Sequence, residues 1–203
     1  VLLFYLDNMK NKDKKAQEAS IRNEAAEQLL DRDMEEDYPS TPEEVAEYCS
    51  NITEMLYSGT EDSYIEALAM KIREIYDDEF LENNEEEKYL TNLYSDIAAW
   101  KKAERTIINY VVLKDDEKNI KTIDGREYAT IRVSYTIMEK VKVSEVRKYL
   151  LRKDEAGRWK IFGWETEPFA LPEGDYTMFK HGGVPFGGVM KPCEPGVPTH
   201  WLN

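Results

Sequence analysis

The sequence predicts an α+β protein in which three N-terminal helices pack on a strongly curved, antiparallel or mixed β-sheet. Two observations lead to this prediction. Between residues 41 and 102 the apolar residues recur at the spacing of an amphipathic helix. From Ala103 onward the period changes to two, which is typical of strands with one buried face. A run of helices followed by a run of strands is typical of helices laid on one face of an antiparallel sheet.

The first segment, VLLFYL, is apolar and is followed abruptly by Asn and Lys. Residues 1–6 would cover only about 9 Å as a helix, whereas a membrane span needs about 20 apolar residues. Two readings are open: residues 1–6 are the end of an N-terminal membrane anchor, or they are a short element that packs on the domain. Tyr5, as an interfacial aromatic residue, and the lysines that follow favour the anchor.

We therefore expect a membrane-anchored, single-pass protein of the cell envelope. The lysines between residues 10 and 15 favour a cytoplasmic position for the residues after the anchor. Charge alone does not determine on which side of the membrane the domain lies, and we expect the extracytoplasmic side. Residues 7–37 predict a charged helical stalk, because a thin apolar stripe runs through a segment rich in Lys, Glu, Asp and Ala. The pattern breaks at Tyr38-Pro39.

Three amphipathic helices follow. Thr41, Pro42 and Glu44 form a capping box with proline at the first helical position, and Gly59 ends this first helix. The second helix is expected from about residue 61 to 77. The third begins after a cap at Asn83 or Asn84 and reaches Trp100. Each helix has one apolar face, so each must cover part of a core.

Five strands are expected at 105–114, 119–123, 126–139, 144–153 and 158–165. Asp124-Gly125 is typical of a tight type I′ hairpin turn, and the residues 154–157 are a second hairpin signal. In 126–139 the buried face is predicted to consist of Ala129, Ile131, Val133, Tyr135 and Ile137. The even-numbered residues, on the opposite face, are mostly polar. Such a face is compatible with a homodimer in which two sheets pair, and equally with a monomer.

The last segment, 167–203, is predicted to be an irregular extension. From Pro168 it holds six of the eight prolines and six of the ten glycines, which cannot sustain helix or ladder hydrogen bonds. Both histidines, His181 and His200, lie in this segment. Residues 38–166 therefore form the expected globular domain.

Composition excludes several functions. The net charge of −14 repels nucleic acid, and the only basic patches are short. Two distant cysteines predict neither a disulfide framework nor a zinc site. Cys49 lies on an apolar helix face and is expected to be a buried thiol, although pairing with Cys193 stays open. We expect no metal and no cofactor.

The closing hairpin RKYLLRKDEAGRWKIFGWE contains Gly-x-Trp-x-Ile at residues 157–161 and resembles the NTF2-like superfamily. The stretches YPSTPEEV and FLENN also resemble an uncharacterised family of membrane-anchored proteins from Gram-positive bacteria. The first resemblance covers residues 38–166 and implies a cone with an internal pocket. Enzymes of that superfamily use a pocket carboxylate as a base, which an apolar cavity assists by raising its pKa.

No residue of the sequence stands out as that base. Asp96 and Glu165 are the carboxylates that we considered, and we expect both to be solvated. Five aromatic residues either line an apolar pocket or fill it, and filling is the favoured reading: Trp100, Tyr110, Tyr135, Trp159 and Trp164. The Tyr135 hydroxyl is expected to reach a backbone carbonyl.

We therefore expect a membrane-tethered, NTF2-like binding or assembly module without enzymatic activity. An envelope protein or a small apolar ligand would be its partner. One alternative is a small-molecule isomerase, cyclase or ligand carrier that uses the cone pocket. Another is a subunit of a secretion or conjugation assembly.

Overall fold

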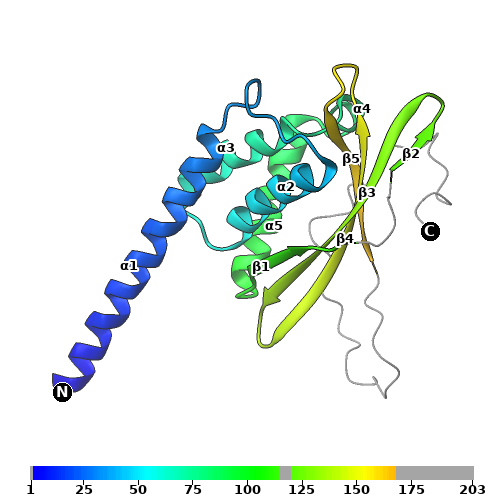
Figure 1. Ribbon diagram of the computed structural model, residues 1–203. Coiled ribbons are helices and arrows are strands. Elements are labelled where there is room, and N and C mark those ends of the chain that lie inside the picture. Colours follow the sequence, from blue (N-terminus) through cyan, green and yellow to red (C-terminus); the bar gives the residue numbers. More distant parts are fainter. Residues whose placement is uncertain (1, 115–119, 168–203) are drawn as a thin grey trace, which may run out of the picture.

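The computed structural model describes residues 2–114 and 120–167 (Figure 1). The α+β class is confirmed. In the described residues the helices are α1 (Leu2–Asp31), α2 (Pro42–Tyr57), α3 (Asp62–Arg73), α4 (Asp78–Glu82) and α5 (Glu86–Lys102). The strands are β1 (Thr106–Val112), β2 (Ile120–Ile123), β3 (Arg126–Met138), β4 (Lys142–Lys153) and β5 (Trp159–Glu167). Figure 1 shows the helices on one side of the sheet.

Helix α2 begins where its capping signal predicts. The Thr41 hydroxyl accepts a hydrogen bond from the Glu44 amide, and the Glu44 carboxylate accepts one from the Thr41 amide. Pro42 occupies the first helical position, where the missing N–H costs nothing. Gly59 follows the helix with φ of +85°, which favours glycine.

The predicted second helix is wrong at its end, because α3 stops at Arg73 rather than at residue 77. The chain then runs beside β5: the Asp77 amide donates to the Ile161 carbonyl at 2.9 Å, and the Ile161 amide donates to the Ile75 carbonyl at 2.8 Å. These long-range hydrogen bonds replace the bonds that a continued helix would make. The short helix α4, which was not predicted, then begins with Asp77 as its cap.

The predicted start of the third helix at Asn83 or Asn84 is also shifted, because α5 begins at Glu86. The side-chain amides of Asn83 and Asn84 instead donate to the Glu79 and Phe80 carbonyls, which satisfies the last carbonyls of α4. The asparagines therefore end one helix rather than start the next.

Helix α1 extends away from the rest of the molecule at its N-terminal end (Figure 1). Its last turns pack on the domain. Ala26 is fully buried, the Tyr48 hydroxyl donates to the Leu29 carbonyl, and the Tyr64 hydroxyl donates to Glu27. The expected helix is present, but it ends at Asp31, and its C-terminal turns are part of the domain.

All strands pair antiparallel, in the order β1-β3-β4-β5, with β2 beside the first residues of β3. The β2–β3 turn has positive φ at Asp124 and Gly125, as the predicted type I′ turn requires. The strong curvature that we expected is wrong (Figure 1). The central ladder between β3 and β4 runs from Tyr128↔Arg152 to Met138↔Lys142 without a register shift. The flanking ladders each have one, at Ile107/Asn109 and at Leu150/Leu151, and the sheet as a whole is not strongly curled.

The core lies between the helices and the inner face of the sheet. The predicted alternation on β3 is confirmed by the burial of Ala129, Ile131, Val133, Tyr135 and Ile137. Helix α2 packs against β1 and β3 with its buried face. The even-numbered residues of β3 from Tyr128 to Met138 are partly buried, and one of them, Arg132, forms a two-point ion pair with Glu167 at the end of β5.

Candidate functional site

The five aromatic pocket candidates lie on four different elements of the fold: Trp100 on α5, Tyr110 on β1, Tyr135 on β3, and Trp159 and Trp164 on β5. The structure brings Tyr110 and Tyr135 together, with ring centroids 6.3 Å apart. Trp100 instead packs on Tyr57 at 4.7 Å. Trp159 and Trp164 pack at two other positions along β5. The five rings therefore pack in different regions of the core.

Trp164 packs against Phe80 of α4 at 5.4 Å and against Tyr149 of β4 at 6.0 Å. Trp159 lies near the start of β5, where its carbonyl accepts a hydrogen bond from the Tyr38 hydroxyl at 2.7 Å. The Lys153 ammonium lies over the Trp159 ring at 5.0 Å. These contacts connect β5 to α4, to β4 and to the segment before α2.

A chain of hydroxyl groups crosses the centre of the core. Tyr149 and Tyr135 are hydrogen-bonded at 2.7 Å, Tyr135 and Ser50 at 2.8 Å, and the Ser50 hydroxyl donates to the Ala46 carbonyl at 2.7 Å. A hydroxyl has one hydrogen to donate. Since Ser50 gives its hydrogen to Ala46, Tyr135 donates to Ser50, and Tyr149 donates to Tyr135.

This chain corrects the expectation that the Tyr135 hydroxyl reaches a backbone carbonyl directly, because Ser50 lies between them. Burial raises the pKa of Tyr135 to about 12, so the phenol is neutral at physiological pH. Cys49, the residue before Ser50, is a buried free thiol as predicted, and burial raises its pKa to about 11. Cys193 lies outside the described residues, so the question of its pairing with Cys49 stays open.

Two charged residues of β4 face the core beside this chain. The Arg147 guanidinium lies 4.9 Å from the centre of the Tyr135 ring, and its Nε is 3.3 Å from Glu145 Oε1. Burial raises the pKa of Glu145, and the adjacent guanidinium opposes this shift. The sequence analysis missed both residues, although the strand alternation that places Tyr149 inward also places Glu145 and Arg147 inward.

The two carboxylates considered as bases have different surroundings. Asp96 on α5 accepts a hydrogen bond from the Tyr57 hydroxyl at 2.5 Å. Burial, followed by the charge of Asp96, raises the pKa of Tyr57 well above its ordinary value. Glu165 lies on β5, where it is 3.8 Å from the Lys148 ammonium. Asp96 therefore belongs to the interior polar groups, and Glu165 belongs to an ion pair between strands.

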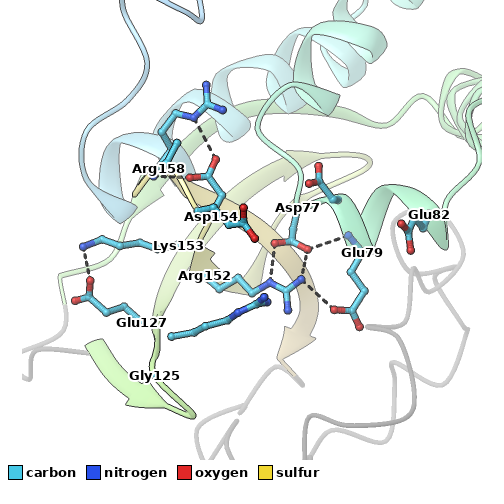
Figure 2. A pocket seen from close by; sticks show the side chains of 13 residues that line it. Asp77, Glu79, Glu82, Gly125, Glu127, Arg152, Lys153, Asp154 and Arg158 are labelled. Carbon is cyan, nitrogen blue, oxygen red and sulfur yellow. Dashed lines mark hydrogen bonds and ion pairs between the residues drawn. The ribbon is translucent and has the colours of Figure 1, made fainter.

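A groove of about 1000 Å³ lies at the other end of the sheet, between α4 and the turns of the β2–β3 and β4–β5 hairpins (Figure 2). Nearly all of its lining side chains are charged. They are Asp77, Asp78, Glu79, Glu82, Gly125, Arg126, Glu127, Arg152, Lys153, Asp154, Glu155, Ala156 and Arg158. We call this surface the charged groove.

The floor of the charged groove is a buried ion pair (Figure 2). Arg152 Nε lies 2.7 Å from Asp77 Oδ2, and its Nη2 lies 2.5 Å from Asp77 Oδ1. The same Nη2 is 3.0 Å from Glu79 Oε2, and the guanidinium lies 4.2 Å from the centre of the Phe162 ring. Asp77 also accepts from the Glu79 amide, so one carboxylate both caps α4 and holds it against β4.

The walls of the charged groove hold further ion pairs. Lys153 contacts Glu127 across the two hairpins, and Arg158 Nε lies 3.1 Å from Asp154 Oδ2. In the part of the chain that the structure describes, four lining residues have no ion-pair partner: Asp78, Glu82, Glu155 and Arg126. All four are exposed. Asp77 and Glu79 also share the single cation Arg152, so the described lining carries seven carboxylates against four basic side chains.

A second hollow of about 640 Å³ lies between α1 and α2. Arg32 closes one side of it, because its guanidinium pairs with Asp37 at 3.0 Å and lies 5.1 Å from the centre of the Tyr48 ring. Within residues 2–114 and 120–167 no three metal-ligating side chains come together. No helix in these same ranges is both long and apolar enough to cross a membrane.

The comparisons with known proteins give one match. The model of a family described as "Domain of unknown function (DUF6715)" matches residues 1–164. No curated protein and no solved structure is similar enough to the chain to match it.

Proposed function

The chain belongs to the family described as a domain of unknown function (DUF6715), and from its own residues we propose that it is a non-enzymatic binding or assembly module. The observation behind this proposal is the closed hydrogen-bond chain from Tyr149 through Tyr135 and Ser50 to the Ala46 carbonyl. A fully satisfied polar network makes a core rigid and specific. It supports a scaffold that presents its outer surface to a partner.

The interior carboxylates support the same proposal. A general base must be free to accept a proton from a substrate within hydrogen-bond reach. Asp96 already accepts a hydrogen bond from Tyr57, and Glu145 contacts Arg147. Both acids therefore already have partners from the protein that orient them.

We propose that the fold is an NTF2-like variant that has lost the strong curvature of a cone. The order of elements and the hairpin at residues 157–161 support this relationship. An experimental structure of residues 38–203 tests it. Helices α2, α3 and α5 and the β3–β4–β5 sheet should superpose on NTF2-like structures. A different strand order would contradict the proposed relationship.

We also propose that α1 carries the domain on a single-pass membrane tether that begins before or within residues 1–6. The apolar opening segment and the projection of α1 support the tether (Figure 1). Fractionation of cells that express the tagged full-length protein tests it. We expect the protein in the membrane fraction until detergent is added, and release without detergent would contradict the tether.

Crosslinking of intact cells tests the binding function. After crosslinking and purification of the tagged chain, we expect one discrete heavier species that contains a second protein or a second copy. A ladder without a discrete species, or the monomer alone, would contradict the proposal. This test uses the whole surface of the molecule and does not depend on which face binds.

A second candidate function is a small-molecule enzyme or ligand carrier. Glu145 favours it, because this carboxyl group faces the core, is largely buried and has a raised pKa. A carboxyl group whose pKa is raised by burial can act as a general acid. Titration of the purified chain with small apolar carbonyl compounds, followed by tryptophan fluorescence, tests this function. Saturable binding that Glu145→Gln abolishes would favour it over the binding module.

A further inference from the structure

We propose that the charged groove binds an extended protein segment that carries several lysine or arginine side chains. This inference rests on the binding function proposed above and gives its partner a chemical class. The groove is open at the surface, and its volume of about 1000 Å³ lies at the upper end of the range for ligand sites. It therefore has room for several side chains rather than for one ion.

The charge of the groove selects the sign of the partner. Each basic lining residue except Arg126 is already in an ion pair, through Asp77, Glu127 or Asp154. The three carboxylates without a partner come from both sides: Asp78 and Glu82 from α4, and Glu155 from the β4–β5 turn. A cationic segment lying between α4 and this turn can contact acids on each side.

The groove is fixed in shape before any partner binds. Asp77 and Arg152 are only 5% and 9% exposed, so the pair that forms the floor is almost fully withdrawn from solvent. The Asp77 amide also binds the Ile161 carbonyl, which attaches the start of α4 to β5. A preformed site loses less entropy on binding than a flexible one.

The chemistry of the lining excludes other partners. Phosphate groups of nucleic acids or anionic lipids would meet a net negative surface, which repels them. Small apolar ligands need hydrophobic walls, and among the described lining residues only Gly125 and Ala156 are uncharged. A metal ion needs converging ligands, and the described residues contain no such group. A lysine- or arginine-rich segment fits the remaining features.

The test measures fluorescence anisotropy of a labelled peptide of alternating lysine and glycine with the full-length chain in detergent. The groove variant D78N/E82Q/E155Q removes three exposed carboxylates. A matched control, E24Q/E47Q/E87Q, removes three exposed carboxylates from α1, α2 and α5. We expect the groove variant to weaken binding about tenfold and the control to weaken it less than about twofold.

Substitution of Arg126 is predicted to increase the affinity for the peptide, a result that misfolding of the variant would not produce. Arg126 is the one uncompensated cation of the described groove lining and should repel lysine. We expect Arg126→Gln to bind the lysine peptide about twofold more tightly and to leave a matching glutamate peptide unbound. Spermine distinguishes a free polyamine from a protein segment, and we expect it to compete only weakly.

Three results would overturn the inference: equal losses in the groove and control variants, no gain from Arg126→Gln, or tighter binding of spermine than of the peptide. A different experiment tests the proposed binding function. This function would be contradicted by the absence of a discrete crosslinked species in cells. If the groove variant keeps that species unchanged, the module binds its partner through another face and only the groove assignment is lost.

Discussion

Arg152 and Asp77 are 75 residues apart in sequence and form a two-point ion pair, with nitrogen–oxygen distances of 2.7 and 2.5 Å. The pair joins the cap of α4 to β4, and it forms the floor of the charged groove. One contact therefore determines both a long-range feature of the fold and the shape of the surface that we propose as a binding site.

Arg152→Met is expected to destabilise the protein by about 3 kcal/mol, because it leaves the buried Asp77 carboxylate without its counter-ion. Arg152→Met combined with Asp77→Asn should recover part of this loss, since asparagine still caps α4 and carries no charge. Urea denaturation of the three proteins measures the difference. A double variant that is less stable than Arg152→Met would show that Asp77 is not the group left uncompensated.

Lys148→Met is the matched comparison. Its ammonium is 3.8 Å from Glu165, whose side chain is 43% exposed. Water screens such a pair, so its loss should change the free energy of unfolding by less than about 1 kcal/mol. A loss as large as that of Arg152→Met would contradict the distinction between the groove floor and the other ion pairs between strands.

The direction of the hydroxyl chain predicts unequal effects of two similar substitutions. Tyr135→Phe removes two hydrogen bonds of the chain, those to Tyr149 and to Ser50, which should cost about 1–3 kcal/mol. Tyr149→Phe removes the first donor of the chain and leaves the bonds from Tyr135 to Ser50 and from Ser50 to Ala46 in place. Its cost beyond packing should be about 1 kcal/mol. Equal losses, or the reverse order, in urea denaturation would reject the assigned direction.

Glu145 predicts a pH dependence of stability. Its pKa in the folded protein lies above the ordinary value of 4.5, chiefly because of burial. The folded state then holds the proton more tightly than the unfolded state, so the contribution of Glu145 is fully present below pH 4.5 and is lost as the pH rises through the raised pKa.

Glu145→Gln should therefore gain stability relative to the wild-type chain as the pH rises from acid to neutral. Denaturation at a series of pH values measures the difference between the two proteins. The same series for Glu47→Gln, at an exposed position of α2, corrects for the loss of one surface charge. A difference that is constant with pH, or that falls, would contradict the raised pKa.

Gly157 in the β4–β5 turn has φ of +79°, and a Cβ added there meets no atom within 4 Å. The cost of Gly157→Ala is therefore conformational rather than steric with neighbours, and should be about 1 kcal/mol. Gly157→Asn should cost less, since asparagine tolerates positive φ. Equal melting temperatures of the wild-type chain and Gly157→Ala would contradict the turn conformation.

Local signals predicted much of the fold. The capping box at Thr41 and Glu44, the Asp124-Gly125 turn and the alternation around Tyr135 act over a few residues, and each is present in the structure. Features that depend on distant residues were missed. Helix α4 exists because the Ile75–Asp77 segment bonds to β5, and no local pattern of residues 74–82 reports that partner.

The candidate site shows the same division. Both hairpin turns of the charged groove were predicted, but their approach to α4 requires the pair between Asp77 and Arg152. The inward position of Glu145 and Arg147 could have been read from the alternation with Tyr149. Neither residue was predicted to face inward, because burial of a charge next to its partner is a tertiary property.

Site-specific photo-crosslinking in cells tests the central claim most directly. A photoreactive residue at Ala156, exposed in the charged groove, is compared with one at Ser95, exposed on α5. We predict a discrete crosslink to a lysine- or arginine-rich segment of another protein from position 156 alone, and its loss in the D78N/E82Q/E155Q variant. Equal crosslinking from both positions, or a crosslink at 156 that the variant leaves unchanged, would contradict the account.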